Sequence, residues 1–236
     1  MRIGSLSKLR APWVAVPLLL VLAACGSGAP QPKPSHSAAA EDNLPVMGPE
    51  RRILAFGDSL FAGYNVKESE AYPARLETAL RAQGVNARIS NGAVSGDTSA
   101  AALQRLAFTL GGQASPPDLA IVELGGNDML RGLSPKETKA NIGASVKELQ
   151  ARKIPVLIMG MRAPPNLVAA YRQEFDAVYP ALAKQYGVPL VPFFLQSIYD
   201  KPDLLQQDRM HPTPRGIEEL VAATIDDVKR ALPEKK

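Results

Sequence analysis

Three side chains that lie far apart along the chain could together activate a serine. Ser59 follows an apolar run in Gly57-Asp58-Ser59-Leu60, whereas Asp208 and His211 lie three residues apart near the C-terminal end. A serine hydroxyl is a weak nucleophile until a base takes its proton and a third group orients that base. The sequence therefore predicts Ser59 as nucleophile, His211 as general base and Asp208 as the group that orients the imidazole.

Each part of this triad also has a plainer interpretation. A serine in this position can cap a helix, and an Asp-x-x-His pair can form a surface ion pair. The G-x-S-x-G elbow of the common α/β-hydrolases is absent, because Phe61 occupies the place of the second glycine. The pattern as a whole indicates serine hydrolysis on another scaffold.

Donors for a developing oxyanion are expected in two further loops. Asn127, in Gly125-Gly126-Asn127-Asp128, has an amide that can donate to such an oxygen, and donors of this kind contribute roughly 3 kcal/mol. Gly96 and Ser59 could each present a backbone N–H. The alternative for both loops is that these residues only form turns. This alternative is stronger for the Gly96 loop than for the Asn127 loop.

No metal or cofactor is expected to take part in this chemistry. A catalytic zinc needs about three protein ligands, and only His211 lies in the part of the chain that is expected to fold, because His36 falls in a linker. The single cysteine, Cys25, belongs to no metal or redox motif.

The elements that must hold these residues alternate between strands and helices. Such alternation predicts a parallel sheet with helices on both faces, and active sites in such sheets lie at the carboxyl ends of the strands. The loops that contain Ser59, Gly96 and Asn127 all follow predicted strands. Strands are expected at 52–56, 86–90, 119–124, 155–160 and 188–193, with the last at a sheet edge because of Pro189 and Pro192; helices are expected at 71–83, 98–110, 134–152, 171–186 (kinked or broken near Pro180) and 214–230.

The N-terminal segment is typical of an exported protein. Basic residues at 2–10 precede a short apolar run, which ends in Leu22-Ala23-Ala24-Cys25. This ending resembles a bacterial lipoprotein processing site, which implies cleavage before Cys25 and lipidation of that cysteine. A plain secreted protein with a stray cysteine is the alternative. We expect a signal peptide at 1–24, a lipidated Cys25 with a flexible linker at 25–49, and a catalytic domain at 50–236.

Net charge gives no indication of a polyanionic partner. The formal charge of +4 includes three basic residues of the leader, so the processed chain would carry about +1. No lysine or arginine cluster with interleaved aromatic residues is present in the sequence, and nucleic-acid binding is therefore not expected.

Together these segments resemble the SGNH (GDSL) hydrolase superfamily, whose four blocks centre on Ser, Gly, Asn and His. The resemblance covers residues 51–230, and the blocks occur in the expected order: Ile53–Gly63, Asn91–Thr98, Gly125–Arg131 and Asp208–His211. Met161 to Pro165 and Tyr179 to Phe194 are more narrowly similar to bacterial arylesterases and to the multifunctional acyl-thioesterase/lysophospholipase group. Pro164-Pro165-Asn166 departs from the Pro-Ala-Asn-like loop of that group, so no acyl-length preference is implied.

The resemblance implies a three-layer, flavodoxin-like α/β fold with a parallel five-stranded sheet. It implies hydrolysis of an acyl ester or thioester without a cofactor, with Ser59, Asp208 and His211 as triad. It also implies Gly96, Asn127 and the Ser59 N–H as the oxyanion hole. Apolar loops near 161–168 and 193–205 are expected to form an acyl groove.

Two alternative functions remain open from the sequence, a carbohydrate O-deacetylase of the cell envelope and a non-catalytic envelope lipoprotein. The expected substrate is a small acyl ester or a lipid-like molecule, and the expected state is a monomer. The expected location is the periplasm-facing cell envelope, lipid-anchored at the outer membrane; otherwise the protein would be secreted or periplasmic.

Overall fold

A computed structural model describes residues 46–234, and these residues form a parallel sheet covered by helices. The sheet has five strands in the order β2-β1-β3-β4-β5, and every neighbouring pair is parallel. Its strands are β1 (Arg51–Gly57), β2 (Ala87–Asn91), β3 (Leu119–Glu123), β4 (Val156–Met159) and β5 (Leu190–Val191). The predicted fold class is thereby confirmed.

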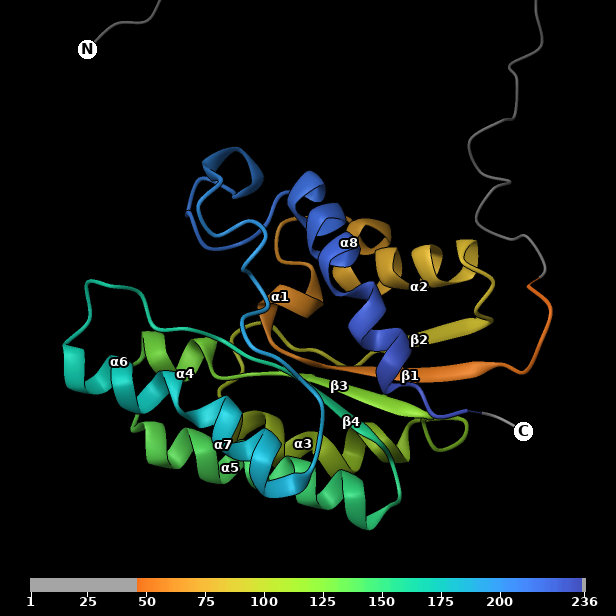
Figure 1. Cartoon of the computed structure of the whole chain (residues 1–236), viewed down its shortest axis with the longest axis horizontal. Helices are drawn as coiled ribbons and strands as arrows, with labels where there is room; N and C mark the ends of the chain where they lie inside the picture. Colours follow the sequence, from red (N-terminus) through yellow and green to blue (C-terminus); the bar gives the residue numbers. More distant parts are fainter. Residues whose placement is uncertain (1–45, 235–236) are drawn as a thin grey trace, which may run out of the picture. The chain divides into compact units, whose positions relative to one another are not determined.

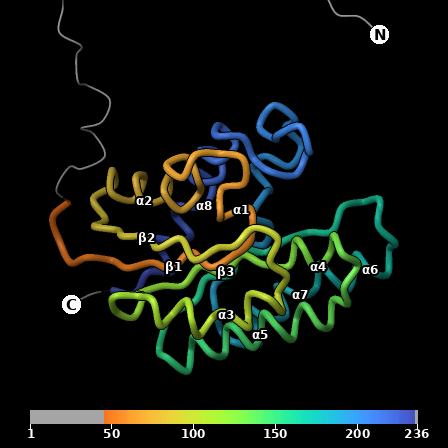
Figure 2. The backbone as a smooth tube through the Cα atoms, turned by 180° about the vertical axis from the view of Figure 1, so that it is seen from behind, coloured from red at the N-terminus to blue at the C-terminus, as the bar shows by residue number. Residues whose placement is uncertain are grey.

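Helices cover the two faces of the sheet in two separate groups (Figures 1 and 2). One face carries α1 (Ser59–Ala62), α2 (Tyr72–Ala82) and α8 (Pro214–Ala231), and α2 packs against α8. The other face carries α3 (Ser99–Gly111), α4 (Gly126–Leu130), α5 (Pro135–Ala151), α6 (Ala169–Asp176) and α7 (Val178–Tyr186). Two short 3-10 helices, η2 (Glu68–Glu70) and η3 (Pro202–Leu204), lie in connections.

The sequence explains where the long helices begin. The Thr98 side chain accepts a hydrogen bond from the Ala101 N–H, so it caps α3. Ser134 caps α5 through the Lys136 N–H, and Pro135 occupies the first turn, where a missing N–H has no cost. All five residues of β3 are buried, as expected for a central strand with helices on both faces.

Prolines shape two elements, a helix break of the kind predicted near Pro180 and a last strand that is shorter than expected. The helix expected at 171–186 is interrupted at Ala177, so that Pro180 falls in the first turn of α7, where a proline is tolerated. The last strand is only two residues long, because Pro189 and Pro192 flank it and neither can donate to a sheet ladder. β5 lies at the sheet edge as predicted.

Two short helices, α1 and α4, were not expected from the sequence. Each begins directly after the carboxyl end of a central strand, where β1 is followed by Ser59 and β3 by Asn127. Both residues therefore lie in first turns of helices at the same edge of the sheet. The predicted signal peptide, Cys25 and nearly all of the predicted linker lie outside the described residues, and within residues 46–234 no helix is long and apolar enough to cross a membrane.

Candidate active site

Ser59 is held at the first position of α1 by its neighbour in the sequence. Asp58 is the N-cap residue, and its Oδ1 accepts a hydrogen bond from the Leu60 N–H at 3.1 Å. The first N–H groups of a helix have no acceptor within the helix. The Ser59 N–H therefore lies at the positive end of a short helix, beside its own hydroxyl.

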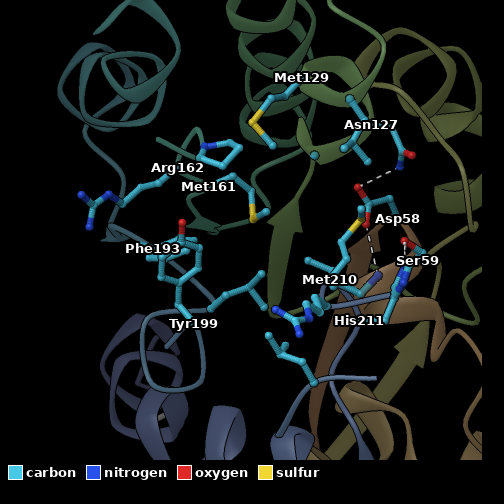
Figure 3. A pocket seen from close by; sticks show the side chains of 17 residues that line it. Asp58, Ser59, Asn127, Met129, Met161, Arg162, Phe193, Tyr199, Met210 and His211 are labelled. Carbon is cyan, nitrogen blue, oxygen red and sulfur yellow. Dashed lines mark hydrogen bonds between the residues drawn. The ribbon is translucent and has the colours of Figure 1, made fainter. Parts of the chain in front are cut away.

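The structure brings together all three residues of the predicted triad. The Nε2 atom of His211 lies 2.9 Å from Ser59 Oγ (Figure 3). Its Nδ1 lies 2.7 Å from Asp208 Oδ2. The histidine side chain is 13% exposed and that of Asp208 is 37% exposed. Proton transfer from the serine hydroxyl to a carboxylate-oriented imidazole is therefore geometrically available.

Asp208 and His211 belong to one tight loop, closed by a bridge between Leu205 and Pro212. The Gln206 N–H donates to the His211 carbonyl at 2.7 Å. Within the loop, Asp208 Oδ1 accepts from the N–H groups of Met210 and His211 at 2.9 and 3.0 Å. Burial is the largest single influence on Asp208 and raises its pKa, but the hydrogen bonds from His211 and Met210 together outweigh it and lower the pKa below its usual value. The carboxylate that faces the imidazole is thus stable.

Asn127 is joined to the nucleophile loop by Asp58. Its Nδ2 donates to Asp58 Oδ2 at 3.1 Å (Figure 3). The same Nδ2 donates to the Asp97 carbonyl at 3.0 Å. Asn127 and Ser59 both line the same pocket. A substrate oxygen would have to share one of these two amide hydrogens or replace an acceptor.

Gly96 adopts a left-handed backbone conformation (φ 85°), which a residue with a side chain rarely accepts. Its carbonyl accepts from the guanidinium of Arg131 at 2.8 Å. The neighbouring Asp97 carboxylate binds Arg105 at 2.5 Å, and Arg105 also donates to the Gly57 carbonyl at 3.1 Å. These two arginines fix the loop on which Gly96 stands, although Gly96 is not among the residues that line the pocket.

A second carboxyl group, that of Glu123, lies beneath the site. Its side chain is fully buried, and Asp58 is only 2% exposed. Burial raises the pKa of Glu123 well above the usual value, and the negative charge of Asp58 raises it further. Burial also raises the pKa of Asp58, to about 6, although the Leu60 N–H, Glu123 and Asn127 act in the opposite direction.

The reactive residues open into an apolar pocket of about 240 Å³. Ser59, Asn127 and His211 lie on one side, and Arg162 and Phe193 lie on the opposite side (Figure 3). Residues from both predicted groove segments, 161–168 and 193–205, contribute to it. The apolar lining consists of Leu60, Met129, Leu130, Met161, Pro164, Phe193, Leu195, Tyr199, Leu205 and Met210. An acyl chain or aryl group suits such a lining.

Within residues 46–234, no group of three or more His, Cys, Asp or Glu side chains is placed to hold a metal ion.

Sequence reasoning missed several groups that shape the site. Glu123 was read only as part of an apolar strand, although a lone acid in a buried run is itself a signal. Tyr64, whose ring centre lies 4.4 Å from that of His211, had no recognisable pattern. The hydrogen bonds from Arg105 and Arg131 to neighbouring loops depend on loop geometry that local sequence does not determine.

Comparison with known proteins places this chain in a family. The model of the GDSL-like lipase/acylhydrolase family matches residues 55–218. The thioesterase 1/protease 1/lysophospholipase L1 of Escherichia coli K12 is 39% identical over 160 residues, which are 68% of this chain and 74% of that protein. An arylesterase of Vibrio mimicus is 37% identical over 165 residues, 70% of this chain and 82% of that protein.

A solved structure resembles the chain more closely in sequence. AlinE4, an SGNH-hydrolase family esterase, is 62% identical, and the match has a TM-score of 0.67. It covers 80% of this chain and all of the AlinE4 chain.

Proposed function

This chain belongs to the GDSL-like lipase/acylhydrolase family and hydrolyses carboxylic esters or thioesters, and we propose that Ser59, His211 and Asp208 carry out that reaction. The observation that supports the assignment best is the unbroken chain of contacts from Ser59 Oγ through the imidazole to Asp208, with distances of 2.9 and 2.7 Å. Contacts of this length permit direct proton transfer.

The proposed reaction proceeds in two halves. His211 Nε2 takes the proton of Ser59 as Oγ attacks the acyl carbon, and the carbonyl oxygen becomes an oxyanion. His211 then returns the proton to the leaving oxygen or sulfur, which leaves an acyl-enzyme. Water, deprotonated by the same imidazole, releases the carboxylic acid and restores the serine.

The oxyanion is assigned to three donors, the N–H groups of Ser59 and Gly96 and the amide of Asn127. The helix start at Ser59 and the presence of Asn127 in the lining of the same pocket support this assignment. Donors that are already oriented before the reaction cost no reorganisation when charge develops. The Asn127 amide would exchange or share its contact with Asp97 in that step.

We expect a fluorophosphonate probe to label the wild-type protein at one site, Ser59. Ser59→Ala should lose the label, whereas Ser69→Ala, at an exposed serine, should keep it. Intact-mass spectrometry measures the adduct, and an ester panel run beside it compares short aryl esters, longer acyl esters, acyl thioesters and acetylated sugars. Equal labelling of wild type and Ser59→Ala would exclude the assignment, and turnover of acetylated sugars alone would favour an O-deacetylase.

We also propose a lipid-anchored monomer of the cell envelope, facing the periplasm. Support comes from the sequence, in which a basic start and an apolar run lead to Leu22-Ala23-Ala24-Cys25. Expression in a bacterial host with an alkyne-bearing fatty acid should label the protein, and Cys25→Ser should abolish the label and release the protein from the membrane fraction. A label that survives in Cys25→Ser, or a wild-type protein found only in the soluble fraction, would contradict this proposal.

A further inference from the structure

Two buried carboxyl groups meet beneath the nucleophile. Glu123 ends β3 and pairs in register with Gly57 of β1, the residue before Asp58. A Cβ atom on Gly57 would lie 3.2 Å from Glu123 Oε2, so the carboxyl packs directly against the backbone that leads to the nucleophile loop. The carboxyl of Asp58 is within hydrogen-bonding reach of that of Glu123.

The two groups differ in the donors that they receive. Asp58 accepts from the Leu60 N–H and from the Asn127 amide. The oxygens of Glu123 have no side-chain donor within residues 46–234, and only the Asp58 backbone N–H approaches them. A buried carboxylate without donors and beside a second carboxylate is strongly disfavoured.

Another buried acid at the same edge of the sheet provides a contrast. Asp128 accepts three hydrogen bonds, from the N–H and hydroxyl of Ser99 and from the hydroxyl of Thr138. Asp128, which acts as an acceptor, is therefore surrounded by donors. The side chain that faces Glu123 is an acceptor, Asp58, so Glu123 fits this place as a protonated carboxyl that donates its O–H.

We propose that Glu123 is a positioning residue, a neutral carboxylic acid whose O–H donates to Asp58 and thereby fixes the acceptor that orients Asn127. This inference rests on the proposed function, because Asn127 is assigned there to the oxyanion.

The proton on Glu123 has an electrostatic consequence for the reaction. Negative charge develops on the substrate oxygen above Asp58, and one carboxylate below it already opposes that charge. A second ionised carboxylate would oppose it further, at low local dielectric. Sharing one proton limits the pair to a single negative charge and still leaves Asp58 able to accept from Asn127.

Other titratable groups face the pair from the surrounding elements. His211 lies on the triad loop, Tyr179 on α7 and Asp128 on α4, and Arg105 of α3 donates to the Gly57 carbonyl. The Tyr179 hydroxyl is occupied, since it donates to the Leu124 carbonyl at 2.9 Å. Burial raises the pKa of Glu123 in the folded protein above its ordinary value of 4.5. The stability that the protonated carboxyl contributes to the folded state is therefore complete below pH 4.5. It is lost as the pH rises from 4.5 through the folded pKa.

This linkage gives a test that does not depend on catalysis. Urea unfolding of the full chain, followed by far-UV circular dichroism, is compared between wild type and Glu123→Gln from pH 6 to 8. The glutamine keeps a donor to Asp58 and has no proton to lose. The ratio of the wild-type to the mutant unfolding constant should rise with pH, approaching about tenfold per pH unit while folded Glu123 keeps its proton. Glu174→Gln, the same substitution at an exposed site, is the matched control.

Kinetics test the positioning role. Glu123→Met has a similar volume but no donor, and we expect its kcat to fall about tenfold, the usual effect of losing a hydrogen bond to a charged group, with KM within about twofold. Glu123→Gln should restore kcat to within about threefold of wild type.

Two results would overturn the inference. A ratio of unfolding constants that stays flat from pH 6 to 8 would show that Glu123 is ionised in the folded protein. A wild-type kcat in Glu123→Met, or an equal loss in Glu123→Gln, would show that the O–H donor positions nothing. If the wild-type protein hydrolysed no ester, the proposed function would fail, but the unfolding comparison would still decide the protonation state.

Discussion

Ser59→Ala is expected to lower kcat for ester hydrolysis by about four to six orders of magnitude. Without the hydroxyl no acyl-enzyme can form, and only the oxyanion donors and substrate binding remain to accelerate attack by water. The substitution removes one oxygen at the first turn of α1 and leaves the cap formed by Asp58 and Leu60 unchanged. Steady-state kinetics, with thermal unfolding as the check on folding, measure the effect.

The double variant Ser59→Ala/His211→Ala makes this prediction sharper. Residues that act as one unit lose their effect together, so adding the histidine substitution should lower kcat by less than about threefold more. A Ser59→Ala protein that retains more than about one per cent of wild-type kcat, after contaminating hydrolases are excluded, would rule out Ser59 as nucleophile.

The next largest effect is expected for Asp208→Asn, with a fall in kcat of about ten thousandfold. An asparagine amide placed against Nδ1 donates instead of accepting, so the imidazole proton moves to Nε2. His211 then has no lone pair to take the proton of Ser59. Because the pKa of Asp208 is lowered below its ordinary value of 3.8, the wild-type carboxylate is ionised throughout the range from pH 5 to 9. A pH–rate profile from pH 5 to 9 should therefore show the loss throughout.

Asparagine is a suitable replacement because it preserves the loop. Its side-chain oxygen can still accept from the N–H groups of Met210 and His211, as Oδ1 of Asp208 does. Asp203→Asn, at an exposed acid in η3, serves as the matched control. A kcat of Asp208→Asn above about a tenth of the wild-type value would mean that water or another group orients the histidine.

Local patterns were sufficient to predict most of the fold. The buried strand at 119–124 and the Ser134-Pro135 helix start depend on neighbours in the sequence, so both were found close to their observed bounds. The two-residue length of β5 and the exact position of the helix break, at Ala177, depend on how prolines fit against the rest of the sheet and helices. Those outcomes are decided by packing, which a single sequence does not report.

The site divides in the same way. Ser59, Asp208 and His211 were predicted because their chemistry requires particular residue types, and the structure brings their reactive atoms within hydrogen-bonding distance. The environment of Glu123 was not predicted, because its meaning depends on the register that places it against Gly57. Arg105 donates hydrogen bonds to Asp97 and to the Gly57 carbonyl, which lie on separate loops. Only the folded chain shows that connection.

The bridge between Leu205 and Pro212 closes a loop that carries both Asp208 and His211. Any displacement of this loop moves acid and base together and preserves the geometry between them. A shift of the loop would therefore change the distance between Ser59 Oγ and His211 Nε2, but not the distance between His211 Nδ1 and Asp208 Oδ2.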